Sequence, residues 1–217
     1  MIHPGISFWK QRTHLLWLAA RSSDAGIFPR PMKSSSRKEK LPSTGNYNRV
    51  QIFAKQFIII VMKTKALFPG SFDPFTAGHL NILKRALTMF DEVVVAVGIN
   101  QDKRGFFDMD QRIAIISQAV EGLEGVSIIK YDNLTIDTCH ELGIHHIVRG
   151  VRNMIDFETE RSIADANRRL APDVETIIIP TAQEFAHISS SAVRDILKHH
   201  GDTSLFLPEG VVLPEAK

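Results

Sequence analysis

The stretch from Ser71 to His79 combines residue types suited to binding a phosphate group. Gly78 lets a ligand come close to the backbone, and His79 falls in the first turn of a predicted helix. A helix N-terminus offers unpaired N–H groups and a positive dipole end, which favour an anion. A histidine there can donate a hydrogen bond to a phosphate that gains charge during displacement. We interpret His79 as a candidate transition-state residue; for this residue alone, a capping role is the competing interpretation.

Basic and hydroxyl side chains follow other apolar runs along the chain. Lys103 follows the second predicted strand, Arg149 and Arg152 come at the end of the fourth, and serines 189–191 come after the fifth. Ligands of doubly wound α/β sheets bind outside the carboxyl ends of the strands, so these groups are expected at one edge. Consecutive hydroxyl and N–H groups at a helix start can hold phosphates. The simpler interpretations are a solvated lysine, arginines paired with the acidic helix that follows, and serines that only cap a helix. Such pairing is plausible for one of the two arginines and strained for both.

The elements that would position these groups alternate from Met62 onward. Short apolar runs rich in β-branched residues predict buried parallel strands at 66–68, 93–97, 126–130, 146–149 and 175–179. Amphipathic stretches predict helices at 78–90, 108–120, 136–142, 157–170 and 189–199. Asp108 and Gln111 have capping-box spacing, and Asp156 and Ser189 are candidate caps. The alternation predicts an α/β fold with a doubly wound, five-stranded parallel sheet.

The run at 69–79, Pro-Gly-Ser-Phe-Asp-Pro-Phe-Thr-Ala-Gly-His, contains the T/H-x-G-H signature of the nucleotidyltransferase superfamily at 76–79. The whole run closely resembles the bacterial-type phosphopantetheine adenylyltransferases, and the resemblance extends from Lys63 to about Val211. It implies a Rossmann-like nucleotidyltransferase fold. It also implies transfer of an adenylyl group from ATP to 4′-phosphopantetheine, which gives dephospho-CoA and pyrophosphate in coenzyme A biosynthesis.

Three further motifs carry the resemblance: Arg-Gly-Val-Arg at 149–152, Asp-Phe-Glu-Thr-Glu at 156–160, and Ile-Ser-Ser-Ser at 188–191 followed by Arg194. The catalytic residues that it implies are His79, Lys103 and Arg152. The implied contacts to the other substrate are Ser71, Lys103, Thr135 and Arg149. The implied ATP-binding residues are Ser71, Phe72, His79, Gly150, Val151, Arg152, Glu160, Phe185, Ala186, His187, Ile188, Ser189, Ser190 and Ser191.

The resemblance also implies the partners of the chain. Mg²⁺ is expected to bind through ATP oxygens, as it often does, and no residue is assigned as a metal ligand. The expected partners are ATP, 4′-phosphopantetheine and further copies of the chain in a homohexamer in the cytoplasm. Neither a nucleic acid nor a membrane is expected as a partner. The substrate phosphate is expected to attack the α-phosphorus directly, without a covalent enzyme intermediate.

Two alternative functions stay open. The first is another nucleotidyltransferase of the superfamily, such as a nicotinate mononucleotide adenylyltransferase; the motifs at 149–152 and 156–160 argue against it. The second is a non-catalytic nucleotide-binding module whose basic N-terminal segment binds nucleic acid. The presence of His79, Lys103 and the serines at 189–191 argues against a module without activity.

The composition excludes several classes of protein and divides the chain in two. No apolar run approaches the roughly 18 residues needed to span a bilayer, and the single cysteine, Cys139, excludes an internal disulfide. The net charge of +2 hides a contrast, because residues 1–61 carry ten basic and two acidic side chains. Residues 62–217 carry 16 basic and 22 acidic side chains. The overall charge is therefore no argument for a nucleic-acid partner.

Residues 1–61 have no sustained helical or strand period, and prolines and a Ser-rich basic run interrupt them. They can be interpreted as an organellar transit peptide, a basic binding arm, a disordered tail, or upstream sequence that precedes a true start at Met62. We favour the last interpretation because Met62 is followed at once by the first predicted strand. The apolar run at 57–61, which could extend that strand, is an argument on the other side. We expect a basic N-terminal extension at 1–61 and a nucleotidyltransferase domain at 62–217.

Overall fold

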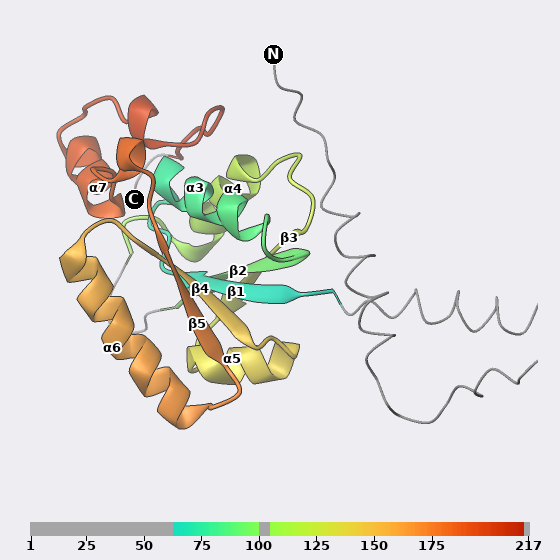
Figure 1. The fold of residues 1–217 in the computed structure, drawn as a ribbon. Helices are drawn as coiled ribbons and strands as arrows, with labels where there is room; N and C mark the ends of the chain where they lie inside the picture. The colour runs from blue at the N-terminus through green and yellow to red at the C-terminus, as the bar shows by residue number, and fades with distance from the viewer. Residues whose placement is uncertain (1–62, 100–104, 215–217) are drawn as a thin grey trace, which may run out of the picture. The chain divides into compact units, whose positions relative to one another are not determined.

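The computed structural model describes residues 63–99 and 105–214, and these form an α/β domain (Figure 1). The predicted extension at 1–61, the predicted start at Met62 and the predicted catalytic Lys103 lie outside the described residues. The five strands are β1 (Lys65–Gly70), β2 (Glu92–Gly98), β3 (Val126–Tyr131), β4 (His146–Val151) and β5 (Glu175–Pro180). The helices are α3 (Ala77–Ala86), α4 (Met109–Ala119), α5 (Thr135–Leu142), α6 (Met154–Leu170) and α7 (Ser190–Lys198). Two short 3₁₀ helices, η1 (Gln183–Phe185) and η2 (Ser204–Phe206), lie on either side of α7 in the sequence.

All strand pairs in the sheet are parallel, in the order β3-β2-β1-β4-β5. Along the chain the sheet grows from β1 through β2 to β3, and then continues on the other side of β1 with β4 and β5. The strand order therefore reverses between β1 and β4, and a ligand crevice is expected at their carboxyl ends. The predicted doubly wound, five-stranded parallel sheet is confirmed.

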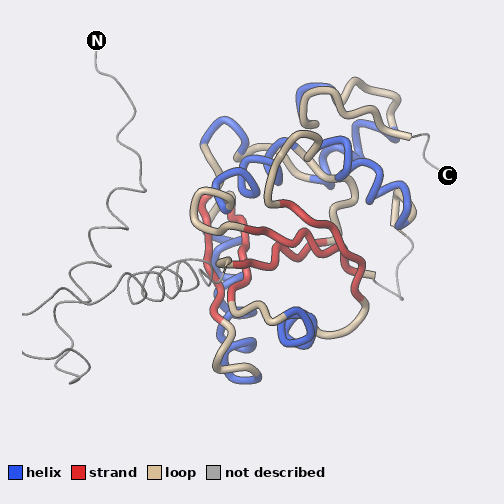
Figure 2. The backbone as a smooth tube through the Cα atoms, turned by 90° about the vertical axis from the view of Figure 1, so that its right-hand side faces the viewer, coloured by secondary structure: helices blue, strands red, loops and turns tan. Residues whose placement is uncertain are grey.

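Helices cover both faces of the sheet (Figures 1 and 2). On one face α3 and α4 pack on alternate strand residues, with Leu83 and Ile116 fully buried. On the other face α5 and the segment before β5 pack on Leu67 and Ala96. Since both faces are covered, the inner strands are apolar on both sides, and for this reason they read as continuous β-branched runs. None of the helices in the described residues has the length and apolarity needed to cross a bilayer.

Helix caps explain where the observed helices differ from the predicted ones. The Asp108–Gln111 capping box and the Ser189 cap are confirmed, with side-chain acceptors 2.9 and 3.1 Å from backbone nitrogens. The predicted cap at Asp156 is wrong: the Oδ1 of Asn153 accepts from the N–H of Asp156 at 2.9 Å, so α6 begins at Met154 instead of 157. The helix predicted at 78–90 ends at Ala86, because the chain turns to place Phe90 in the core.

Replacing Gly150 by a larger residue is expected to destabilise the fold. A Cβ added at Gly150 would lie 2.7 Å from Cγ1 of Ile82, which is buried in α3 and stiff because it is β-branched. Gly150→Ala should lower the free energy of unfolding by about 1–3 kcal/mol, measured by urea denaturation. Gly78→Ala is the matched control, since its Cβ would make only ordinary contacts of 3.7 Å or more. When Ile82 is also replaced by alanine, Gly150→Ala should lower the free energy of unfolding by less. If the decrease is as large as in the wild-type background, a clash with Ile82 is not its cause.

Candidate active site

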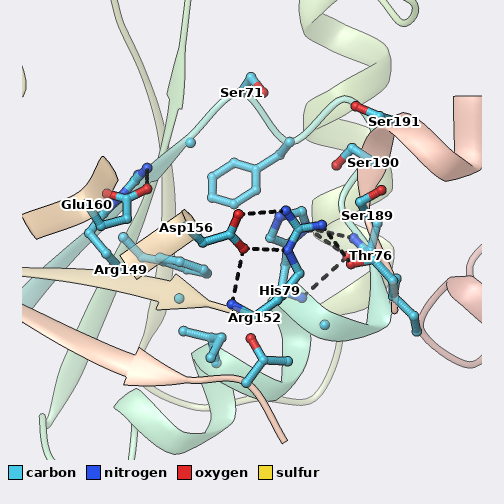
Figure 3. A pocket seen from close by; sticks show the side chains of 18 of the residues that line it. Ser71, Thr76, His79, Arg149, Arg152, Asp156, Glu160, Ser189, Ser190 and Ser191 are labelled. Atoms are coloured by element: carbon cyan, nitrogen blue, oxygen red, sulfur yellow. Dashed lines mark hydrogen bonds and ion pairs between the residues drawn. The ribbon is translucent and has the colours of Figure 1, made fainter. Parts of the chain in front are cut away.

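A cavity of about 410 Å³ opens at the carboxyl ends of β1 and β4, at the point where the strand order reverses (Figure 3). The loop between β1 and α3, the end of β4, the first turns of α6 and the start of α7 all contribute to its wall. Its lining includes most of the residues predicted for the site: Ser71, Phe72, His79, Arg149, Gly150, Arg152, Glu160, Ile188, Ser189, Ser190 and Ser191.

The loop between β1 and α3 is shaped around Phe72. This residue has a φ of 46°, in the left-handed region, and its ring is buried against Phe68 and Phe75 with centroids 5.3 Å apart. Its ring also meets that of His79 edge-on at 5.2 Å. Gly70 permits this turn, because a Cβ at Gly70 would come within 2.8 Å of the Phe72 ring. The aromatic cluster thus fixes the plane of the His79 ring. Non-glycine residues with left-handed backbone conformations, such as Phe72, are often found at functional sites.

His79 is both a helix cap and a cavity residue. The backbone N–H of Thr76 donates to Nδ1 of His79 at 3.0 Å, and the backbone N–H of His79 faces Oγ1 of Thr76 at 3.4 Å. A nitrogen that accepts an N–H carries no proton itself, so the proton of the neutral ring is on Nε2. Burial, followed by the charges of Arg149 and Arg152, lowers the pKa of His79 to about 4. The imidazole is therefore a neutral hydrogen-bond donor through Nε2 near pH 7.

This lowered pKa makes stability depend on pH. The unfolded chain binds a proton at His79 with a pKa near 6.5 and the folded chain only near 4, so acid favours unfolding. The stability due to neutral His79 is complete above about pH 6.5 and is lost as the pH falls toward 4. Between pH 7 and 5 the free energy of unfolding should fall by about 2 kcal/mol more in the wild type than in His79→Asn. Equal pH slopes in urea titrations of the two proteins would contradict the shift.

Arg149 is held by a carboxylate and a carbonyl at the floor of the cavity. Its Nε and Nη2 donate to the two carboxylate oxygens of Glu160 at 2.7 and 2.6 Å, and its Nη1 donates to the carbonyl of Pro69. About a quarter of the Arg149 side chain is exposed. The pair joins the end of β1, β4 and α6, and it presents a fixed guanidinium plane to the cavity.

Arg152 is paired with the same helix. Its Nε donates to Asp156 at 2.8 Å and its Nη2 at 3.2 Å, and its backbone N–H also faces that carboxylate. These hydrogen bonds hold the pKa of Asp156 below its usual range. Ion pairing with the acidic helix was expected to be plausible for one arginine and strained for both; this expectation is wrong, because both arginines pair with carboxylates of α6. Because both guanidinium groups also line the cavity, pairing orients them there instead of removing them from it.

The start of α7 packs on the loop between β1 and α3. The Oγ of Ser189 caps the helix, and the Oγ of Ser190 donates to the carbonyl of Pro74 at 2.9 Å. Arg194 donates to the carbonyl of Asp73 at 2.6 Å and to Oγ of Ser191 at 3.0 Å. The three serines line the same cavity as His79 (Figure 3).

A second cavity of about 330 Å³ adjoins the first and shares Pro69, Gly70, Ser71 and Arg149 with it. It extends along the face of the sheet that α5 and α6 cover. Thr135, predicted to contact substrate, lies here, with its Oγ1 3.3 Å from the hydroxyl of Tyr131. The lining residues of this cavity that were not predicted from the sequence are Pro69, Gly70, Gly98, Ile99, Tyr131, Ile147, Ile163, Asn167 and Thr176.

Four predicted ATP-binding residues are not among those lining the two cavities. Val151 is buried at the end of β4. Phe185 and Ala186 are in and after η1, behind the start of α3, and the ring of His187 packs on Phe206 with centroids 6.0 Å apart. Conversely, Asp156 and Thr159 line the first cavity although they were not predicted as site residues from the sequence. Helical spacing could have identified these two residues, because positions 156, 159, 160, 163 and 167 share one face of α6.

The cavity does not supply the ligand set of a protein-held metal centre. Among residues 63–99 and 105–214, no group of three His, Cys, Asp or Glu side chains is arranged to hold a metal ion. The two carboxylates of the cavity, Asp156 and Glu160, are each engaged by an arginine. What the cavity offers is a concentration of cationic and neutral donors, which suits phosphate groups.

The chain matches the cytidylyltransferase-like family over residues 67–196. The phosphopantetheine adenylyltransferase of Flavobacterium psychrophilum is 47% identical over 147 residues, which are 68% of this chain and 97% of the relative. The corresponding protein of Porphyromonas gingivalis is 45% identical over 151 residues, 70% of this chain and 98% of the relative. That of Legionella pneumophila is 43% identical over 157 residues, 72% of this chain and 92% of the relative.

A solved structure of a bifunctional NMN adenylyltransferase/ADP ribose pyrophosphatase from Francisella tularensis has a TM-score of 0.55. It is 16% identical, and the match covers 68% of this chain and 46% of that one, so it bears on the fold alone. The sequence relatives are matched over almost their whole length, and they share one name. The chain belongs to the phosphopantetheine adenylyltransferase family of the cytidylyltransferase-like nucleotidyltransferases.

Proposed function

We propose that this chain transfers the adenylyl group of ATP to 4′-phosphopantetheine and releases pyrophosphate. The observation that carries the proposal is the pair of adjoining cavities that meet at Arg149, with the Nε2 donor of His79 in the first of them. The first cavity has the serine-rich helix start expected for the phosphates of ATP. The second is lined mainly by apolar groups together with Thr135, Asn167 and the Tyr131 hydroxyl, which fits an arm that carries both methyl and amide groups.

In the proposed reaction a phosphate oxygen of 4′-phosphopantetheine attacks the α-phosphorus of ATP in line. A new P–O bond forms, and the bond between the α-phosphorus and the bridging oxygen breaks, so pyrophosphate leaves with the electron pair. The protein contributes positioning and charge stabilisation, as in other phosphoryl-type transfers. We assign the Nε2 proton of His79 and the guanidinium of Arg152 to the α-phosphate, and Arg149 to the attacking phosphate. Lys103, on sequence grounds, would contact both substrates.

The remaining predicted contacts enter the proposal by their position. Ser189 to Ser191 and Ile188 would hold the β- and γ-phosphates, and Glu160 would contact the nucleoside while it orients Arg149. Ser71 lines both cavities and is proposed to contact both substrates. Mg²⁺ is proposed to arrive on ATP oxygens, because the carboxylates of the cavity are engaged by arginines. An ATP-bound ion would neutralise phosphate charge.

We also propose that the chain self-associates, as a homohexamer by family resemblance. Helix α6 supports self-association, because none of its 17 residues is fully buried in the single chain. Met154, Ile155 and Leu170 are 70%, 79% and 66% exposed, and burying these apolar side chains against another surface would be favourable. Light scattering of the purified chain should give about six times the monomer mass, and Ile155→Glu should lower it. A monomeric mass at micromolar concentration would contradict the proposal.

The function is tested with the full chain, ATP and 4′-phosphopantetheine. Pyrophosphate release should depend on both substrates, and dephospho-CoA should appear in equal amount by mass spectrometry. Nicotinate mononucleotide in place of 4′-phosphopantetheine serves as the matched control for the related reaction. Absence of release, or equal release with nicotinate mononucleotide, would refute the proposed substrate.

A further inference from the structure

Thr176, on the edge strand β5, has a buried hydroxyl group without a partner. Its Oγ1 is shielded from solvent and makes no hydrogen bond to any of the residues that the structure describes. Among those residues only one other buried side-chain nitrogen or oxygen is unpaired, the Nε of Arg112. The guanidinium of Arg112 is still held, because its Nη1 donates to the carbonyl of Ser71 at 3.0 Å. Folded proteins pair nearly all buried polar groups, so the hydroxyl of Thr176 requires an explanation.

Thr176 belongs to the wall of the second cavity. It pairs with Ile147 in the sheet, and both residues line that cavity together with Ile163 and Asn167 of α6. Arg149, two residues after Ile147 on β4, lies on the same face of the sheet, roughly 6–7 Å further along the strand. Arg149 is shared by the two cavities, so Thr176 lies further from the first cavity than Arg149 does. An arm that extends into the second cavity from a phosphate at Arg149 would therefore pass Thr176.

The chemistry of this hydroxyl suits a neutral polar group. The hydroxyls of Tyr131 and Thr135, which line the same cavity, lie 3.3 Å apart and can satisfy each other, whereas that of Thr176 has no such neighbour. Rotation about its Cα–Cβ bond by one staggered step moves Oγ1 to the place of another substituent of Cβ, so it can turn toward a ligand in the cavity. There it can donate or accept a hydrogen bond. The neighbouring Ile147 and Ile163 are apolar, which favours a neutral amide over an ionised group.

We propose that Thr176 is a specificity-determining residue whose hydroxyl bonds an amide group in the arm of 4′-phosphopantetheine. The inference rests on the proposed function, which places this acceptor substrate in the second cavity. Substrate binding would pair a hydroxyl that the free protein leaves unpaired. The same hydroxyl should therefore have two opposite effects: it lowers the stability of the free protein, and it raises the affinity for the acceptor.

The test is Thr176→Val in the full chain, which replaces the hydroxyl by a methyl group of similar size. We expect kcat/KM for 4′-phosphopantetheine to fall about 5- to 20-fold, with the KM for ATP within about twofold of wild type. The melting temperature without substrates should stay the same or rise, because no unpaired hydroxyl is left buried and valine favours strands. Thr176→Ser, which keeps the hydroxyl, should retain most of the kcat/KM for 4′-phosphopantetheine.

Thr138→Val is the matched control, because it removes a hydroxyl that is paired. Thr138 is 3% exposed in α5, its Oγ1 donates to Oδ1 of Asn133, and it lines neither cavity. This variant should have a melting temperature about 2–8 °C below that of the wild type. Its kinetic parameters for both substrates should stay near those of the wild type.

The inference is overturned if Thr176→Val keeps the wild-type kcat/KM for 4′-phosphopantetheine, or loses as much toward ATP. A melting temperature as low as that of Thr138→Val, or failure to fold, would also overturn it, because the hydroxyl would then be paired within the fold. The same holds if Thr176→Ser loses as much activity as Thr176→Val. An inactive wild-type protein would instead refute the proposed function, so the two failures can be told apart.

Discussion

Replacing His79 by alanine is expected to lower kcat about 100- to 1,000-fold while the KM for ATP changes little. The reason is the role proposed for Nε2 of the neutral ring, which is to donate to a phosphate oxygen whose charge grows only as the new bond forms. An interaction made mainly in the transition state appears in kcat and not in ground-state binding. Steady-state kinetics together with calorimetric ATP binding measure the two quantities separately.

The neutral state of the ring makes this prediction sharper. With a pKa of about 4 in the free protein, His79 is neutral near neutral pH, so kcat/KM should show no ionisation of this group between pH 6 and 8. His199→Ala is a suitable control, because His199 is exposed at the far end of α7. Equal losses of turnover and ATP affinity in His79→Ala would contradict the transition-state role.

The architecture could be predicted from the sequence because apolar runs and amphipathic stretches alternate so regularly. In the part of the chain that the structure describes, all five strands and all five longer helices lie where the patterns indicate, within a few residues at each end except for α3. The start of α6 could not be predicted, since Asn153 and Asp156 are equally good caps three residues apart. The choice between them depends on how the chain leaves β4, which is a tertiary property.

The site residues were predicted one motif at a time, and for this reason the individual partners within the site were not identified. Nothing in the spacing of Arg149 and Glu160 indicates that they pair, because the contact requires α6 to pack back beside β4. Capping and catalysis appeared as competing interpretations of His79, whereas Nδ1 serves the cap and leaves the Nε2 proton available. The packing of His187 on Phe206 depends on the C-terminal segment, which no local motif describes.

Replacing Arg149 by alanine is expected to lower kcat/KM for 4′-phosphopantetheine about 100-fold. Arg149 lines both cavities, and hydrogen bonds to charged groups contribute about 1.5–3 kcal/mol. Arg149→Lys should recover only part of the loss, since an ammonium cannot reproduce the planar fork that Glu160 and Pro69 hold. Arg161→Ala is the control, because Arg161 is half exposed on α6 and paired with Glu158. Steady-state kinetics with each substrate varied in turn measure these effects.

The Arg149 variant has a second expected effect, on stability, that must be separated from binding. Removing the arginine leaves Glu160, whose side chain is only 13% exposed, without its partner, and this should cost about 1–3 kcal/mol of unfolding free energy. In the double variant Arg149→Ala/Glu160→Ala most of that loss should disappear, because no uncompensated carboxylate remains. The loss of kcat/KM for 4′-phosphopantetheine should persist, since the phosphate still lacks its guanidinium. If activity returned together with stability, Arg149 would be a structural ion-pair partner and not a substrate contact.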